Sequence, residues 1–189
     1  MVLYCKFKII KKHMIDSNIL IHKINVYTDG ACKKNPGGPG GWGVYVTLCN
    51  KEKEILDTYQ NCHGSNSTTN NRMELTAVIE GLKYIQSNEA KDKQIDLYSD
   101  SKYVIKGINE WSANWKKEDR LNPNNKNPVK NIDLWCDLLD LIPQMSNVTF
   151  HWIKAHTKLK PNDSAEVRAN KYGNYMADKL ANLGMIKAN

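Results

Sequence analysis

The amino-acid sequence predicts an α/β fold in which a five-stranded mixed sheet is flanked by helices. Five short runs have strand character, four longer segments have a helical period, and the two kinds follow one another along a chain of 189 residues. The predicted order is three strands, a helix, a strand, two helices, a strand and a final helix, which is typical of helices packed on a mixed sheet. A chain of this length is most simply one globular domain with a substantial core.

The first three strands are predicted to form an antiparallel meander. Residues 24–28 read as a short strand that carries Asp29 at its end. Residues 33–41 are rich in glycine and proline and predict turns. Residues 42–49 and 54–61 then read as two further strands.

A helix is predicted over residues 71–86, because apolar side chains recur there at intervals of three and four. Its buried stripe comprises Leu75, Val78, Ile79, Leu82 and Ile85. Asn70 or Asn71 can cap the start of this helix. Glu74 then lies in the first turn, at the edge of the stripe.

The second half of the chain alternates between strands and helices. Residues 95–99 read as a strand with Asp100 at its exit, and residues 101–114 continue as a helix. Residues 115–130 are polar and irregular. The remaining predicted elements are a helix over 131–142, a strand over 148–154, a loop over 155–165, and a final helix with Met176, Leu180 and Leu183 in its core stripe.

Residues 1–20 form an extension before a domain that spans residues 21–189. Leu3, Cys5, Phe7 and Ile9 alternate with other residues, a period of two that fits an extra strand. A disordered basic tail is the alternative, and both interpretations stay open. Lysines interrupt every apolar run in this extension, so neither a secretory signal nor a membrane span is expected.

Charge and cysteine usage narrow the setting in which the protein works. The chain has 27 Lys+Arg against 20 Asp+Glu, a net charge of +7. This excess indicates a polyanionic partner, although solvated surface lysines would explain it equally well. The five cysteines form no C-x-x-C pair, so disulfides and zinc sites are poorly supported. We expect free thiols in a reducing, cytoplasmic compartment.

Four acidic residues lie far apart in the chain, two at strand ends and two in helical patterns. They are Asp29, Glu74, Asp100 and Asp178. Carboxylates gathered at strand ends and on a facing helix bind hard divalent cations such as Mg²⁺. Two such ions can clamp the attacking and leaving oxygens of a phosphodiester displacement. Taken singly, each acid could instead be a helix cap or a solvated surface group.

Nine short strings of residues are distinctive in their content and order. They are Tyr-Thr-Asp-Gly-Ala-Cys (27–32), Asn-Pro-Gly-Gly (35–38), Thr-Thr-Asn-Asn-Arg-Met-Glu-Leu (68–75), Ser-Asp-Ser (99–101), Tyr-Val (103–104), Asn-Trp-Lys-Lys (114–117), Pro-Val-Lys-Asn-Ile-Asp-Leu-Trp (128–135), Trp-Ile-Lys-Ala-His (152–156) and Ala-Asp-Lys-Leu-Ala (177–181). Any one of them is weak evidence. Together they resemble type 1 ribonuclease H over roughly residues 24–185, with its fold of three antiparallel strands followed by parallel ones.

The resemblance implies an endonuclease that cuts the RNA strand of RNA–DNA hybrids and leaves 5′-phosphate and 3′-hydroxyl ends. It implies that Asp29, Glu74, Asp100 and Asp178 are catalytic metal ligands for two Mg²⁺ ions, with Mn²⁺ as an alternative. His156 matches the loop histidine that shuttles a proton or assists product departure, a task suited to imidazole.

Two features between His156 and Asp178 depart from the family pattern. His156 and Asp178 are 22 residues apart, a longer interval than is usual, and the extra length falls in residues 158–166. Tyr175 also stands where members often carry an acidic residue. These departures concern the loop around His156 more than the metal site.

The resemblance also implies two sets of substrate contacts. The first set contacts 2′-hydroxyls of the RNA and the substrate near the acids, and comprises Gly30, Cys32, Asn35, Asn70, Asn71 and Asn174. Lys102 stands where members often carry a polar amide, so its contact with the substrate is expected to be with a phosphate instead. Thr69 and Arg72 match positions that hold phosphates of the DNA strand. Residues 111–130 resemble a basic protrusion that grips the hybrid, with Trp115, Lys116 and Lys117 as contacts. Of Trp111, Trp115 and Trp135, we expect at least two to pack inside.

Two alternatives of other classes remain: a catalytically silent hybrid-binding module, and a nuclease or integrase of the same fold that acts on DNA. The presence of all four acids argues against the first, and residues 68–74 with the protrusion argue against the second. The expected partner is an RNA–DNA hybrid, and the expected assembly is a monomer without membrane contact.

Overall fold

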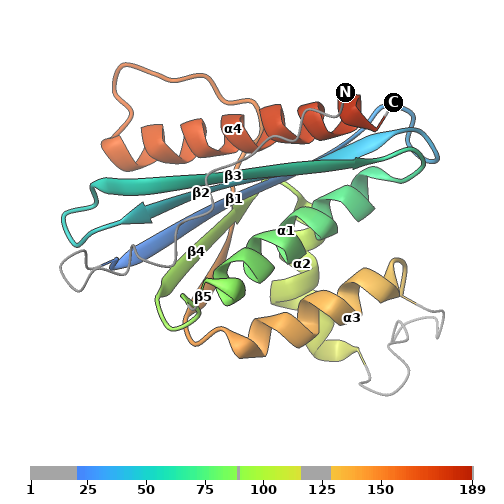
Figure 1. Ribbon diagram of the computed structural model, residues 1–189, viewed down its shortest axis with the longest axis horizontal. Coiled ribbons are helices and arrows are strands. Elements are labelled where there is room, and N and C mark those ends of the chain that lie inside the picture. Colours follow the sequence, from blue (N-terminus) through green and yellow to red (C-terminus); the bar gives the residue numbers. More distant parts are fainter. Residues whose placement is uncertain (1–20, 89, 116–128, 189) are drawn as a thin grey trace.

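A five-stranded mixed sheet forms the centre of the computed structural model, which describes residues 21–88, 90–115 and 129–188 (Figure 1). The strands are β1 (Lys23–Cys32), β2 (Gly40–Cys49), β3 (Ile55–Ser65), β4 (Gln94–Ser99) and β5 (Val148–Trp152). Their order across the sheet is β3-β2-β1-β4-β5. The first three strands pair antiparallel, while β1–β4 and β4–β5 pair parallel, which confirms the predicted fold class.

The helices cover both faces of this sheet. The α-helices are α1 (Asn70–Ser87), α2 (Lys102–Lys106), α3 (Ile132–Leu141) and α4 (Ala165–Lys187). A π-helical turn over Gly107–Trp111 and 3₁₀ turns over Ser112–Asn114 and Ile142–Gln144 complete them. Figure 1 shows α4 alone on one face, with α1, α2 and α3 on the other.

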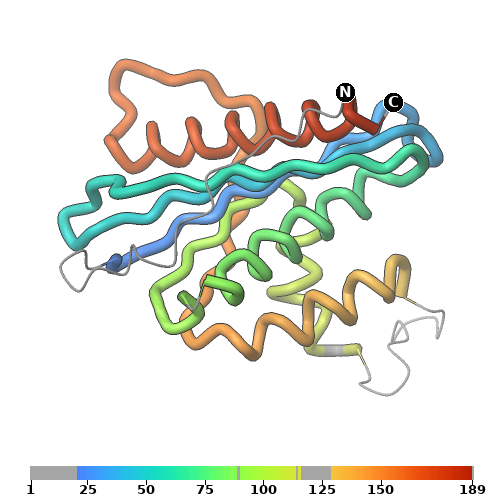
Figure 2. The backbone as a smooth tube through the Cα atoms, viewed as in Figure 1, coloured from blue at the N-terminus to red at the C-terminus, as the bar shows by residue number. Residues whose placement is uncertain are grey.

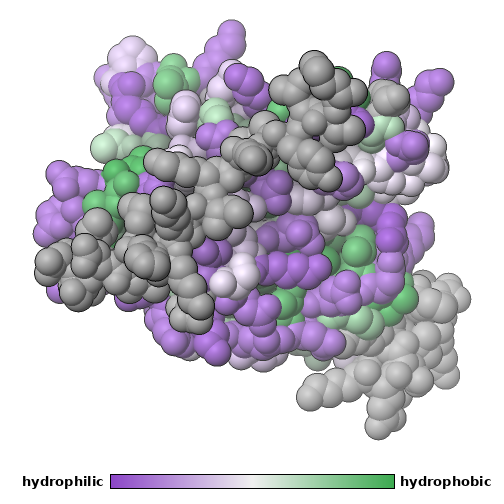
Figure 3. Space-filling model, viewed as in Figure 1, coloured by the Kyte–Doolittle hydropathy of each residue, from purple (hydrophilic) through white to green (hydrophobic). Residues whose placement is uncertain are grey.

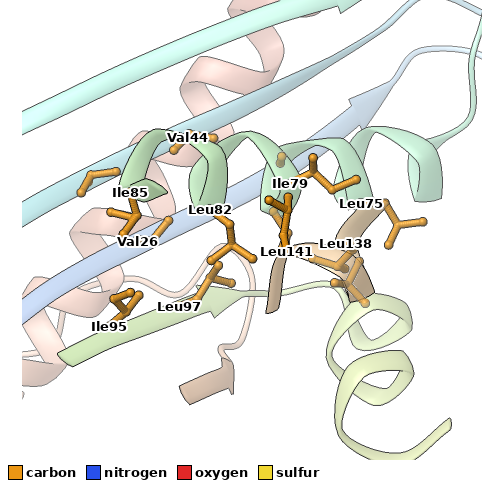
Figure 4. Close-up of a cluster of buried hydrophobic side chains, with 14 of the residues drawn as sticks. Val26, Val44, Leu75, Ile79, Leu82, Ile85, Ile95, Leu97, Leu138 and Leu141 are labelled. Carbon is orange, nitrogen blue, oxygen red and sulfur yellow. The ribbon is translucent and has the colours of Figure 1, made fainter. Parts of the chain in front are cut away.

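The larger core lies between the sheet and α1, with α3 packed behind that helix. The stripe of α1 predicted from its period is buried, and Leu75, Leu82 and Ile85 are among the least exposed side chains. Figure 4 shows Ile85 beside Val26 and Leu82 facing Leu97, while Leu75 lies at the other end of the helix, toward Leu138. Burial of such aliphatic side chains contributes about 1.5–3 kcal/mol each, so this face supplies much of the folding free energy.

A second, smaller core lies under α4, where small residues bring the helix close to the sheet. Tyr27, Tyr45 and Tyr98 pack there beside Ala177 and Leu180. At Gly43 of β2, a Cβ atom would lie 2.3 Å from the carbonyl oxygen of Ala177. The absence of a side chain at this position lets the backbone of α4 rest directly on β2.

The structure differs from the sequence prediction at several element boundaries. β1 runs on to Cys32, so Asp29 lies inside the strand rather than after it. The cause is pairing with β2, which begins at Gly40 inside the segment predicted as turns. The helix predicted over residues 101–114 is α2 followed by π-helical and 3₁₀ turns.

Some of the predictions made from the sequence concern residues outside those that the structure describes. Residues 1–20 and 116–128 are among these, so the N-terminal extension and most of the protrusion stay predictions. Within the described residues, none of the helices combines the length and hydropathy needed to cross a membrane. Figure 3 shows a largely hydrophilic face with apolar residues in scattered patches.

Candidate active site

Two of the four acids are brought together by the parallel pairing of β1 and β4. Thr28 of β1 lies opposite Ser99 of β4, so the residues that follow them, Asp29 and Asp100, reach the same edge of the sheet. Asp29 is 7% exposed, and Asp100 follows the last residue of β4. Ser101 then caps α2 through its hydroxyl, which turns the chain away directly after the acid.

Glu74 reaches the same place from the first turns of α1. A Cβ atom at position 30 would lie 2.3 Å from the backbone nitrogen of Glu74, so only glycine lets α1 approach β1 this closely. Glu74 is 4% exposed. Carboxylate oxygens of Asp29, Glu74 and Asp100 lie within 4.8 Å of one another. The predicted convergence of these three acids is therefore present in the structure.

Hydrogen bonds hold the three carboxylates in place while leaving oxygen atoms free. The backbone N–H of Gly30 donates to Asp29 Oδ1 at 2.7 Å. Asn70 Nδ2 donates to Glu74 Oε1 at 3.3 Å, and Asn174 Nδ2 donates to Asp100 Oδ2 at 3.2 Å. Among the described residues, Glu74 Oε2 and Asn174 Oδ1 are buried without a hydrogen-bond partner. Buried oxygen atoms of this kind suit a hard divalent cation.

Burial and mutual repulsion raise the pKa values of these carboxyl groups. Burial, then the charges of Asp100 and Asp178, raise the pKa of Asp29 to about 8. Burial, then the charge of Asp29, raise the pKa of Glu74 well above its ordinary value. The pKa of Asp100 is also raised, chiefly by burial. A cation bound among them would reverse these shifts, because it stabilises the ionised carboxylates.

Asp178 and His156 lie at the border of the cluster. Asp178, on α4, is half-buried and acts on the pKa of both Asp29 and Asp100. Its own Oδ1 accepts a hydrogen bond from Asn182 Nδ2 at 3.0 Å. His156 is exposed, and its charge opposes the burial that raises the pKa of Asp100. Both residues thus lie within electrostatic reach of the three central acids.

Comparison with known proteins decides the family. The family model described as RNase H matches residues 22–186. The chain belongs to the RNase H family.

Curated relatives agree over most of their length. Ribonuclease H of Ruthia magnifica subsp. Calyptogena magnifica is 47% identical over 167 residues, which cover 88% of this chain and 98% of the relative. Ribonuclease H of Orientia tsutsugamushi is 43% identical, with 87% and 83% covered. RNase H enzymes are metal-dependent nucleases that act by hydrolysis, and this chain is one of them.

Solved structures share the fold. The RNase H domain of PFV superposes with a TM-score of 0.68 at 25% identity, covering 88% of this chain and 96% of that domain. LC9-RNase H1, a type 1 RNase H, superposes with a TM-score of 0.66 at 24% identity, covering 88% and 75%. LC11-RNase H1, solved in complex with an RNA/DNA hybrid, superposes with a TM-score of 0.57 at 20% identity, covering 87% and 98%.

Several of the residues expected to bind substrate lie around the acids of this RNase H. Asn35 Oδ1 accepts the backbone N–H of Asn70 at 3.2 Å, which joins the loop after β1 to the start of α1. Asn71 is exposed in the first turn of α1. Cys32 places its thiol near backbone carbonyls, including that of Thr68 at 3.6 Å. These contacts hold the loop after β1 and the start of α1 together at the rim of the site.

Thr69 and Arg72 make contacts within the protein. Thr69 caps α1, accepting the backbone N–H of Arg72 at 3.3 Å. The guanidinium of Arg72 forks onto Asp133 of α3, with N–O distances of 3.0 and 2.6 Å. The pair is substantially exposed, so a phosphate could compete with Asp133 for this guanidinium.

Of the three tryptophans, one is fully buried and a second is half-buried against the same core. Trp135 is fully buried, and Trp115 meets it edge-on with ring centroids 5.1 Å apart. Trp111 is exposed on its outer side. Lys116 and Lys117 lie outside the described residues, so their predicted contacts stay predictions.

Two residues near the site, Trp152 and Asp133, make contacts that were not predicted from the sequence. Trp152 donates its indole N–H to the backbone oxygen of Asp100 at 3.0 Å, and the ammonium of Lys102 lies 5.1 Å from its ring centroid. Trp152 lies beside β4 because it pairs with Ser99 in the sheet. The strand predicted over residues 148–154 could have suggested this position. Nothing in the spacing of Asp133 reveals that it is the partner of Arg72.

Proposed function

We propose that this protein is an endoribonuclease that hydrolyses the RNA strand of RNA–DNA hybrids. The observation that carries the proposal is the convergence of Asp29, Glu74 and Asp100 within 4.8 Å. It is supported by relatives named Ribonuclease H at 43–47% identity. The hybrid bound to LC11-RNase H1, a protein with the same fold, supports the choice of substrate.

Two Mg²⁺ ions are the proposed cofactors, with Mn²⁺ as an alternative, and Asp29, Glu74, Asp100 and Asp178 would hold them. The donor set fits, because these residues offer only oxygen ligands and, among the described residues, the buried Glu74 Oε2 has no hydrogen-bond partner. When bound, such ions lower the pKa of an attacking water and stabilise the leaving 3′ oxygen. The products would then carry 5′-phosphate and 3′-hydroxyl ends.

The side chains around the acids have separate tasks in this proposal. Asn174 and the backbone N–H of Gly30 orient the carboxylates of Asp100 and Asp29. Burial keeps Glu74 away from bulk water, so its charge acts on whatever enters the site. His156 stands at the exposed border beside Asp100, where imidazole can exchange a proton with solvent.

Recognition of the hybrid would use the polar rim of the site. Asn35, Asn70 and Asn71, with backbone near Gly30 and Cys32, offer small polar groups suited to 2′-hydroxyls in a shallow minor groove. Arg72 and Thr69 would hold phosphates of the DNA strand, with Asp133 displaced from the guanidinium.

A direct assay tests this function. Labelled RNA–DNA hybrid, duplex DNA and duplex RNA are each incubated with Mg²⁺ and the protein, Asp29→Asn, or the matched surface variant Asp137→Asn. We expect cutting of the hybrid alone, intact in Asp137→Asn and lost in Asp29→Asn. Ligation of the fragments without prior phosphorylation would support 5′-phosphate ends.

Other outcomes favour the alternatives. Tight hybrid binding by the unmodified protein without cleavage, in Mg²⁺ or Mn²⁺, would point to a silent binding module. Cleavage of duplex DNA at a similar rate would point to a DNA nuclease of the same fold. We further propose a monomer that works in the cytoplasm, where cysteines such as Cys32, Cys49 and Cys136 stay reduced.

A further inference from the structure

Residues 153–164 connect β5 to α4 and include His156. The end of this loop next to α4 is held by several hydrogen bonds. Figure 2 shows the loop running from β5 back to the N-terminal end of α4. His156 is exposed near its start, in a left-handed backbone conformation with φ of 49°. Three residues near its other end, Asp163, Arg168 and Lys171, form a group that we name the loop anchor.

Asp163 is the centre of the loop anchor. Its carboxylate Oδ2 accepts the backbone N–H of Lys160 at 2.7 Å and the ammonium of Lys171, also at 2.7 Å. The two charged side chains are only 11% and 14% exposed. Lys171 makes a second contact to the carbonyl oxygen of Lys158 at 3.0 Å. One lysine of α4 therefore holds the loop at two points.

Arg168 lies one turn before Lys171, and its side chain binds backbone carbonyl oxygens of the loop. Its guanidinium donates to the carbonyl oxygens of Asp163 and Lys160, both at 3.0 Å, and of Pro161 at 2.7 Å. Charge-assisted hydrogen bonds of this kind are roughly twice as strong as neutral ones. Together, Arg168 and Lys171 contact four loop residues.

The anchor and the active site share one face of α4. Arg168, Lys171, Asn174 and Asp178 follow one another at intervals of three, three and four residues, so their side chains lie along one stripe of the helix. The first two hold the loop, Asn174 donates to Asp100, and Asp178 acts on Asp29. The residues of α4 that hold the loop and those that act on the acids thus lie along one stripe of the helix, about 15 Å long.

We propose that the loop anchor is a positioning device that keeps His156 beside Asp100. The inference rests on the proposed function, in which His156 exchanges a proton at the site. Without the anchor, the loop would sample many conformations, and the fraction with the imidazole near Asp100 would fall. The extra length in residues 158–166 then extends the chain without making the position of His156 less defined.

Steady-state kinetics on a labelled RNA–DNA hybrid test this role. The variants are Lys171→Met, the double variant Arg168→Gln/Lys171→Met, and Lys179→Met, an exposed lysine of the same helix, as the matched control. Each is made in the unmodified chain and in His156→Ala. We expect the double variant to lower kcat about 3- to 10-fold with KM unchanged and Lys171→Met to lower it less. A further variant, Lys171→Arg, keeps the charge and should retain most of the activity that Lys171→Met loses.

The His156→Ala background separates positioning from general damage. There, the anchor variants should cause no further loss, because the group that they position is already gone. A loss of equal size in both backgrounds would overturn the proposal, as would a kcat for the double variant equal to that of Lys179→Met. Mg²⁺ affinity measured by calorimetry should be the same in all chains, and a lowered affinity would also overturn it.

Limited proteolysis measures how readily the loop opens, independently of enzymatic activity. Trypsin can cut after Lys158, whose carbonyl is held by Lys171. We expect this cleavage, followed by mass spectrometry, to be faster in the anchor variants than in Lys179→Met. An unchanged rate would show that the anchor does not hold the loop, whatever the enzyme does. A failure of the unmodified chain to cut hybrids would instead overturn the proposed function and, with it, the role of His156.

Discussion

At the scale of single residues, the buried carboxylates lower the stability of the folded protein when no cation is bound. Burial and the charges of Asp100 and Asp178 raise the pKa of Asp29 from 3.8 to about 8 in the folded protein. Stability that depends on protonated Asp29 is fully present below pH 3.8 and is lost as the pH rises through about 8. Ionisation near neutral pH therefore opposes folding until a cation is bound.

Asp29→Asn should remove much of this penalty. In a metal-free buffer, we expect the unmodified chain to lose thermal stability as the pH rises from about 4 to about 8, while Asp29→Asn loses less. At pH 8, the variant should be more stable by about 1–3 kcal/mol, as for other buried unpaired charges. Thermal melts across this pH range measure the effect, and Mg²⁺ should stabilise only the unmodified chain. Parallel pH profiles for both proteins would contradict the expectation.

Arg72 gives a second prediction at this scale. Arg72→Met should weaken hybrid binding about 10-fold or less and reduce the salt dependence of log Kd by about one phosphate contact. Asp133→Asn should leave affinity unchanged or raise it, because the carboxylate that competes with phosphate is removed. Fluorescence anisotropy in a salt series measures both. Equal weakening by the two variants would indicate that the pair only joins α1 to α3.

Residues with a distinctive local sequence were predictable, whereas their partners were not. Asp29, Glu74 and Asp100 stand in motifs that already indicate metal binding, and the structure brings them together. The pairing of Arg72 with Asp133 depends on how α3 packs against α1, which no spacing in the sequence encodes. The contact from Trp152 to Asp100 likewise depends on the register of β5.

At the scale of elements, α4 is the helix that packs on one face of the sheet. It lies over β1, β2 and β3 and reaches their backbones through small residues on both sides. The same helix carries Asn174 and Asp178 into the active site and the loop anchor onto the preceding loop. Its seating on the sheet therefore sets the geometry of both.

Gly43→Ala tests this seating. The added Cβ would lie 2.3 Å from Ala177 O and 2.4 Å from the backbone nitrogen of Ala181, and neither can move without shifting α4. We expect a loss of about 1–3 kcal/mol, typical of an overpacked core, and a lowered kcat. Gly81→Ala in α1 is the matched control, since its nearest contact is the Val26 side chain at 2.9 Å. Equal urea midpoints for the two variants would contradict this interpretation.

The types and order of the elements were predictable from their periods, and several of their boundaries were not. The glycines of residues 37–41 indicated turns, yet Gly40 and Gly41 begin β2 and pair with β1. At Gly41 a Cβ atom would lie 2.1 Å from the backbone nitrogen of Met185, so α4 packs directly on the strand there. The helix predicted after Ser101 loses its regular form at Gly107, where the ring of Trp135 occupies the space of a Cβ. In both cases a tertiary contact overrides the local preference.

At the scale of the whole molecule, a net charge of +7 coexists with a buried acidic centre. The surface attracts a polyanion, and the site repels it until cations are bound. This division suits an enzyme whose substrate and cofactor carry opposite charges.

Hybrid binding should therefore depend steeply on salt and on metal. Between about 50 and 200 mM salt, we expect the affinity for an RNA–DNA hybrid to fall by roughly 10³-fold or more if six or more phosphates are contacted. Anisotropy titrations with Mg²⁺ and with EDTA measure this, and Mg²⁺ should tighten binding by removing repulsion from the acids. A salt-independent Kd would exclude phosphate contacts as the main source of affinity.

The close seating of α4 has a consequence for a chain cut once between Lys158 and Leu159. The two pieces would remain joined through the tyrosine cluster and the glycine-lined contact, since neither depends on covalent continuity across residues 153–164. We therefore expect the nicked protein to migrate as a single species on a native gel. A peptide of residues 159–189 should rebind a chain that ends at residue 158, as in fragment complementation.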